Sequence, residues 1–160
     1  IELDPERVAP YQYLYEMHLG NQQYAQALDT IQKVSEQLPK DQPNLWVRLF
    51  ASYYEVLNKD PALQTPANLK TAESFLRHAL TIDPTHLEAL ARLGDFHLFA
   101  TKNYPEARAS YAKVLKIVPD APGVREKLSL CYGFEKNYPM AVSILEDLLK
   151  QNPSRAELYQ

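Results

Sequence analysis

Apolar residues recur along this chain at intervals of three and four positions, with polar residues between them. The clearest stretch holds Trp46, Leu49, Phe50 and Tyr53. Residues at this spacing lie on one face of an α-helix, whereas a half-buried strand would alternate residue by residue. The pattern predicts an all-α protein of amphipathic helices.

The apolar stretches repeat. Prolines separated by 34, 45, 35 and 34 residues close successive stretches, and an alanine stands twelve residues before each of the last four prolines. The prolines are Pro5, Pro39, Pro84, Pro119 and Pro153, and the alanines are Ala27, Ala72, Ala107 and Ala141. A period of this length indicates an array of small helical units. We expect the alanines to lie where two helices approach closely, and the prolines to stop the second helix of each unit.

A second set of positions lies upstream of each alanine. Each unit has a leucine followed four residues later by an aromatic residue or histidine, at Leu14/His18, Leu49/Tyr53, Leu93/His97 and Leu128/Tyr132. Asn103-Tyr104-Pro105 and Asn137-Tyr138-Pro139 are typical helix starts, because Asn caps a helix and Pro is tolerated in its first turn. Second helices are therefore predicted to begin near residues 22, 66, 103 and 137.

On these residues the chain resembles the tetratricopeptide repeat family, whose pattern places Trp, Leu, Gly and Tyr in a first helix and Ala and Pro in a second. Repeat 2 has Trp46, Leu49 and Tyr53, and the third repeat has Leu93-Gly94. The resemblance implies an α-solenoid, a right-handed superhelix of antiparallel helix pairs, whose first helices line a concave groove that holds a peptide or partner helix.

The resemblance divides the chain into one array, 1–160. Residues 1–7 would end a preceding repeat, followed by repeat 1 (8–41), repeat 2 (42–86), repeat 3 (87–121), repeat 4 (122–155) and the start of a further repeat (156–160). We expect a fragment of a longer array, with ends able to self-associate because polar caps are missing.

Two features depart from the family pattern. Tyr15 and Phe50 follow the leucine where repeats 3 and 4 have Gly94 and Ser129. Each bulky side chain is expected either to widen the gap between helices or to point into a neighbouring repeat. Repeat 2 also has an insertion at 58–66, rich in turn residues. It is interpreted either as a tolerated surface loop or as a functional one.

Charge and composition exclude some classes of binding partner. A net charge of −3 and a pI near 5.8 argue against nucleic acid, which requires a basic surface. No apolar run is long enough to cross a membrane. Cys131 is expected to be a buried thiol, and compartment is left unknown, cytoplasmic or periplasmic.

Catalytic chemistry is not predicted. The spacing of His18, His78, His86 and His97 does not suit a metal site and favours packing roles. No phosphate-binding loop or nucleophile motif occurs. We therefore expect no enzyme activity, no cofactor and no metal.

Carried over by register, the groove lining is acidic with an apolar floor. It comprises Gln12, Glu16, Asn44, Val47, Tyr54, Glu88, Asp95, Phe99, Glu126, Leu130 and Phe134. Family members that hold acidic chaperone tails use Lys and Asn at such positions, whereas this chain has Gln12, Glu16 and Glu88. A basic or apolar peptide is therefore the expected partner.

Three functions stay open at this point. The first is a scaffold that binds a partner segment in the groove, within a larger assembly or adaptor protein. The second is a structural spacer or oligomerisation segment, and the third is a substrate-selecting arm of an enzyme whose catalytic domain lies outside this chain.

Overall fold

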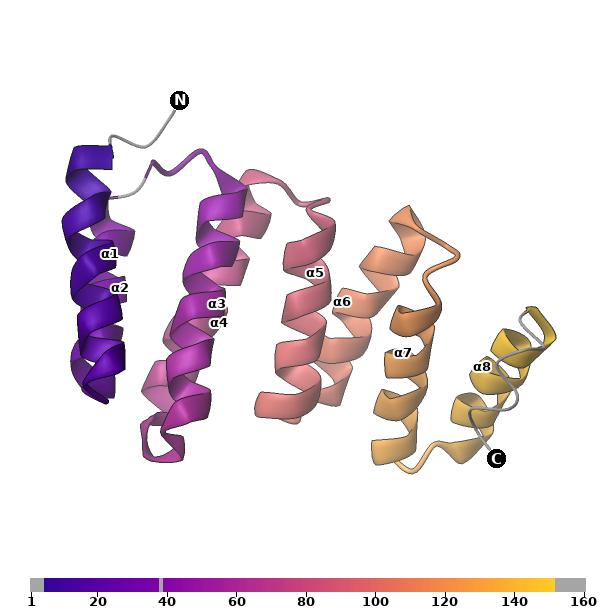
Figure 1. The fold of residues 1–160 in the computed structure, drawn as a ribbon. Helices are drawn as coiled ribbons and strands as arrows, with labels where there is room; N and C mark the ends of the chain where they lie inside the picture. Colours follow the sequence, from indigo (N-terminus) through magenta and orange to yellow (C-terminus); the bar gives the residue numbers. More distant parts are fainter. Residues whose placement is uncertain (1–4, 38, 152–160) are drawn as a thin grey trace. The chain divides into compact units, whose positions relative to one another are not determined.

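The computed structural model describes residues 5–37 and 39–151 and contains only helices and turns in those ranges (Figure 1). The all-α fold class predicted from the sequence is confirmed. The chain forms two compact bodies, residues 1–86 and residues 87–160. No helix among the described residues is long and apolar enough to span a membrane.

The N-terminal body contains two helical hairpins. Its elements are α1 (Pro5–Gly20), α2 (Tyr24–Gln37), α3 (Pro43–Lys59), the 3₁₀ turn η1 (Pro61–Leu63) and α4 (Pro66–Ile82). Helix α1 packs on α2, α2 on α3, and α3 on α4. The start of α1 at Pro5 precedes the expected start of repeat 1, which suits a proline in the first helical turn.

The C-terminal body repeats the arrangement. Its elements are α5 (Leu87–Asp95), the π-helical turn η2 (Phe96–Ala100), α6 (Tyr104–Ile117), α7 (Pro122–Phe134) and α8 (Tyr138–Gln151). Neighbouring helices pack in chain order, α5 on α6, α6 on α7 and α7 on α8.

The repeated alanines lie at the closest helix contacts, as expected. Ala27, Ala72 and Ala107 are fully buried, and Ala141 is nearly so. Among the leucines, Leu49 and Leu93 are buried, but Leu14 is 39% exposed. Leu14 lies on α1, whose main partner among the described helices is α2.

The second helices begin close to the predicted residues, and side-chain caps form at their starts, at the predicted Asn103 and also at Thr65. The Oδ1 of Asn103 accepts a hydrogen bond from the backbone N of Glu106 at 3.4 Å, and the Oγ1 of Thr65 accepts one from the backbone N of Asn68 at 3.2 Å. These bonds satisfy N–H groups that a helix start leaves unpaired. Helices α2, α4 and α6 each end two residues before a proline, since the residue before proline avoids the α region.

The turns inside repeats 1, 3 and 4 share a backbone device that the sequence pattern did not predict. Gln22, Lys102 and Lys136 each stand five residues before the buried alanine, and each has a positive φ, of 58°, 53° and 61°. This left-handed conformation is unusual for residues other than glycine. It lets the chain reverse direction within a few residues.

Repeat 3 is one residue longer than repeat 4, and the structure absorbs that residue in η2. A π-helical turn holds one more residue than the same length of α-helix. The backbone N of Thr101 accordingly donates to the carbonyl of Phe96, five residues earlier. As a result Leu98 is 2% exposed and Phe99 is 55% exposed.

Candidate functional site

The predicted lining residues of the N-terminal body differ in accessibility. Gln12 and Glu16 are exposed on α1, and the Nε2 of Gln12 donates to the Oε1 of Glu16 at 3.2 Å. Asn44 is exposed at the start of α3, where its Oδ1 lies 2.7 Å from the Nε2 of His86. Tyr54 is half-buried and stacks on Phe50 with ring centroids 5.5 Å apart.

Val47 does not belong to an accessible lining. Its side chain is 3% exposed, in the same helix as the buried Trp46 and Phe50. The prediction of Val47 as a groove residue is therefore wrong. An isolated reading of the first-helix register could not separate Val47 from its exposed neighbours, because the packing of α3 between α2 and α4 decides which positions are covered.

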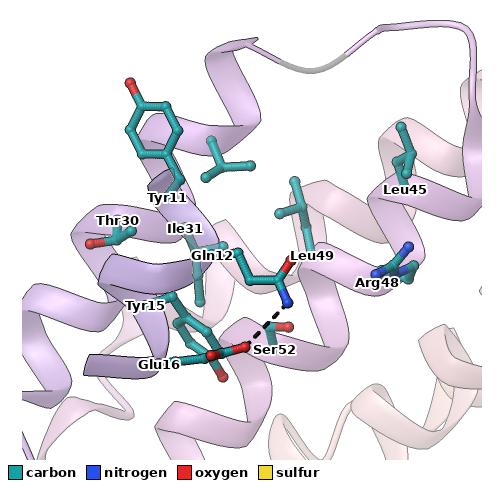
Figure 2. A pocket seen from close by; sticks show the side chains of 11 residues that line it. Tyr11, Gln12, Tyr15, Glu16, Thr30, Ile31, Leu45, Arg48, Leu49 and Ser52 are labelled. Atoms are coloured by element: carbon teal, nitrogen blue, oxygen red, sulfur yellow. Dashed lines mark hydrogen bonds between the residues drawn. The ribbon is translucent and has the colours of Figure 1, made fainter. Parts of the chain in front are cut away.

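A pocket of about 210 Å³ lies in the N-terminal body among α1, α2 and α3 (Figure 2). Eleven residues line it: Tyr11, Gln12, Tyr15, Glu16, Thr30, Ile31, Val34, Leu45, Arg48, Leu49 and Ser52. Gln12 and Glu16 are the two predicted lining residues that it includes. Burial and the nearby Glu55 carboxylate raise the pKa of Tyr15, and the Ser52 hydroxyl acts in the opposite direction.

Two of the acidic residues predicted in the C-terminal body, Glu88 and Asp95, are paired with cations. In α5 the Oε1 of Glu88 lies 2.8 Å from the Nε of Arg92. The Nζ of Lys127 in α7 lies 2.7 Å and 2.8 Å from the two carboxylate oxygens of Asp95. Sequence register placed Asp95 in the lining, but it did not show that a lysine of the next repeat neutralises the carboxylate.

A second group, the hydroxyl of Tyr111, also holds Asp95. The Oη of Tyr111 in α6 donates a hydrogen bond to the Oδ1 of Asp95 at 2.8 Å. Burial and this carboxylate raise the pKa of Tyr111 far above its ordinary value, so the hydroxyl stays protonated. Asp95 therefore ties α5 to both α6 and α7.

Three predicted lining residues of the C-terminal body are large, exposed apolar side chains. Phe99, Leu130 and Phe134 are 55%, 46% and 55% exposed. Phe99 follows Asp95 by four residues, and Leu130 and Phe134 are four residues apart on α7. The ring of Phe134 stacks on Tyr104 with centroids 5.3 Å apart and planes inclined by 13°. We call Phe99, Tyr104, Leu130 and Phe134 the aromatic row.

Glu126 completes the predicted set. It is half-buried on α7, and its backbone carbonyl accepts a hydrogen bond from the Oγ of Ser129 at 2.7 Å. Sequence reasoning missed the half-buried Tyr104 as the stacking partner of Phe134 because its register places it in a second helix. The Asn103-Tyr104-Pro105 helix start was the available signal.

The histidines take part in packing and in hydrogen bonds to neighbouring side chains. His78 packs on Trp46 with ring centroids 4.0 Å apart and planes tilted by 49°, and the Nδ1 of His97 lies 3.1 Å from the Oγ1 of Thr101. Within 5–37 and 39–151, no group of three His, Cys, Asp or Glu residues is placed to hold a metal ion. Cys131 is fully buried, and burial together with Glu135 raises its pKa to about 11, which disfavours the reactive thiolate.

Comparisons with known proteins agree with the arrangement of helices. No model of a protein family matches the chain. The Protein O-mannosyl-transferase TMTC1 of Mus musculus is 29% identical over 126 residues, which are 79% of this chain and 12% of that protein. The Homo sapiens protein of the same name is also 29% identical, over 13% of its length. The chain thus spans about an eighth of the curated relatives it matches.

Solved structures match nearly the whole chain. MamA superposes with a TM-score of 0.67 at 17% identity, covering 96% of this chain and 83% of that one. YrrB, described as a TPR protein with an unusual peptide-binding site, has a TM-score of 0.65 at 20% identity, covering 95% and 72%. The first TPR of Spaghetti (RPAP3), bound to the HSP90 peptide SRMEEVD, has a TM-score of 0.55 at 19% identity, covering 84% and 99%. With its buried alanines, its capped second helices and these neighbours, the chain has the tetratricopeptide-repeat fold.

Proposed function

We propose that this chain is a protein-interaction scaffold that binds an apolar segment of another polypeptide on the aromatic row of the C-terminal body. The observation that supports it most directly is the exposure of Phe99, Leu130 and Phe134 on first helices. Single exposed apolar side chains are ordinary, whereas several large ones on one body, two of them four residues apart on α7, favour an interaction surface. Aromatic anchors are also the residues that dominate the energetics of such surfaces.

The charges beside the row favour an apolar partner over a charged one. Asp95 and Glu88 are already paired with Lys127 and Arg92. A basic peptide would have to displace these cations, and an acidic peptide would have to displace the carboxylates. The Asp95–Lys127 pair therefore holds α5 to α7. The apolar side chains of the aromatic row supply most of the contact with the partner.

The structural neighbours support the general class. YrrB and the first TPR of Spaghetti are both described with a peptide site or a bound peptide. The acidic HSP90 peptide SRMEEVD is nevertheless a poor match for this chain, since Arg92 and Lys127 already have carboxylate partners. We expect SRMEEVD to bind weakly.

The test uses a library of fluorescent 12-residue peptides that vary in charge and aromatic content, together with the seven-residue peptide SRMEEVD. Peptides with aromatic and aliphatic residues should bind best, and Phe134→Ala and Leu130→Ala should each weaken them roughly tenfold or more. Val142→Ala is the matched control, because Val142 is 51% exposed on the second helix α8. Equal binding by all three variants would sink the proposal.

The match to a transferase supports a second candidate. TMTC1 is named as a protein O-mannosyl-transferase, and the matched region is a small part of it. A chain of this fold could serve there as an arm that selects polypeptide substrates. If so, mutating Phe134 within a longer enzyme that contains this chain should change KM for polypeptide acceptors and leave kcat unchanged.

A further inference from the structure

The pocket among α1, α2 and α3 is distinct from the aromatic row, since all eleven lining residues belong to the N-terminal body. We infer that it accepts one aromatic side chain, a phenylalanine or tyrosine, from a polypeptide partner. That the side chain comes from a polypeptide rests on the proposed function. The existence of the pocket does not depend on it.

The size of the pocket selects a side chain over a free small molecule. Pockets that bury drug-sized ligands enclose roughly 300–1,000 Å³. This pocket encloses about 210 Å³. A single large side chain inserted from a bound segment fits that volume, and the rest of the segment would stay outside.

The pocket arises because repeats 1 and 3 carry their large and small side chains on opposite helices. In repeat 3, Gly94 follows the repeat's leucine, and Tyr111 of the second helix fills the space beside it. In repeat 1 the corresponding residues are Tyr15 and Ile31, so the large side chain comes from the first helix. Both line the pocket, and together they leave space unfilled next to α3.

The lining favours an aromatic ring. Ile31, Val34 and Leu49 provide aliphatic walls, and the rings of Tyr11 and Tyr15 provide aromatic partners. Aromatic rings gain edge-to-face and offset contacts with one another that an aliphatic side chain does not make. Two rings and an aliphatic wall therefore suit phenylalanine or tyrosine better than leucine.

The charges argue against a charged occupant. The lining contains one acid, Glu16, and one base, Arg48, both exposed. Their charges cancel, so neither a lysine nor a glutamate side chain would find a net opposite charge. Figure 2 shows Gln12 and Glu16 joined by their hydrogen bond, with Tyr15 and Ser52 beside them. These polar groups can contact the backbone of an inserted segment.

The experiment uses the whole chain with ¹³C-labelled methyl groups and the probes N-acetyl-phenylalaninamide, N-acetyl-leucinamide, N-acetyl-alaninamide and N-acetyl-lysinamide. The phenylalanine probe should shift the methyl signals of Ile31, Val34 and Leu49 saturably. The alanine and lysine probes should bind roughly tenfold more weakly or worse.

Filling the pocket should remove this binding. Val34→Phe is the first variant, and Val142→Phe on the exposed face of α8 is its matched control. Ser52→Leu is a second filling variant at a half-buried position, in case Val34→Phe does not fold. Both filling variants should weaken the phenylalanine probe by about tenfold or more, and Val142→Phe should not.

The inference is overturned by an absence of saturable shifts, by equal shifts from the alanine or lysine probe, or by unchanged binding in the filling variants. None of these results bears on the aromatic row, because the methyl signals belong to the N-terminal body. Conversely, peptide binding that ignores Phe134→Ala would defeat the proposed function and leave the pocket measurement intact.

Discussion

Gly94 in α5 lies against the ring of Tyr111 in α6 so closely that a Cβ atom on residue 94 would stand 2.4 Å from the Cε1 of the tyrosine. The ring is fully buried, and its hydroxyl is fixed by Asp95. It therefore cannot turn away without losing that hydrogen bond. In repeat 3 the volume of Tyr111 explains why the residue after the leucine is small, as the family pattern has it.

Gly94→Ala should destabilise the chain by about 1–3 kcal/mol, because the added methyl group overpacks a buried contact. Urea denaturation monitored by circular dichroism measures the change. Gly133→Ala is the control, since an added Cβ there meets no atom within 4 Å. That variant should be neutral or slightly more stable, and an equal loss in both variants would contradict the prediction.

Asn68→Ala should release the insertion of repeat 2. The Oδ1 of Asn68 accepts from the Oη of Tyr53 at 3.2 Å, and its Nδ2 donates to the carbonyl of Leu63 at 2.8 Å. Losing both bonds should cost about 1–3 kcal/mol. Limited proteolysis should then cut within 58–66 faster. Asn58→Ala, at an exposed position, is the matched control and should behave as the parent chain.

Lys102→Gly should stabilise the chain by roughly 0.5 kcal/mol, since glycine adopts the left-handed φ of 53° without the strain that a Cβ atom brings. Thermal unfolding provides the measurement. Lys113→Gly, at an exposed position inside α6, should instead destabilise by about 1 kcal/mol. Stabilities that fall together in the two variants would contradict the assigned turn.

Cys131 should make the stability depend on pH above about 9. Burial raises the pKa of the folded thiol from 9.0 to about 11, so between these values the unfolded chain loses the proton and the folded chain keeps it. The contribution is fully present below pH 9 and is lost as the pH rises toward 11. The slope attributable to this group is at most about 1.4 kcal/mol per pH unit.

The pH effect is measured as the difference between the parent chain and Cys131→Ala, which removes the thiol and leaves the tyrosines to titrate in both proteins. The parent chain should lose more stability than the variant between pH 9 and 11. Parallel curves would show that the thiol ionises equally in the folded and unfolded states.

Some lining residues could be assigned from the sequence and others could not. Phe99, Leu130 and Phe134, which the register assigns to the lining, are exposed, because helical periodicity separates inward from outward positions. Their role in a lining stays a prediction. Val47 failed the same reasoning, since burial depends on which helices cover α3. In η2 the accessible side chain is Phe99, and its neighbour Leu98 is buried.

The ends of the chain lie outside this comparison. The expected end of a preceding repeat at 1–7 falls partly on residues 1–4, and the expected further repeat at 156–160 falls wholly outside the described residues. Self-association through those ends and the division into repeats stay predictions.

The sequence by itself determined the helices, their caps and the alanines at close helix contacts, because each depends on residues near one another in the chain. Only the tertiary structure decided that Lys127 pairs with Asp95, that Val47 is covered, and that Tyr15 and Ile31 leave a pocket beside α3. Those outcomes depend on side chains brought together from different helices, whose volumes and charges a one-dimensional period does not record.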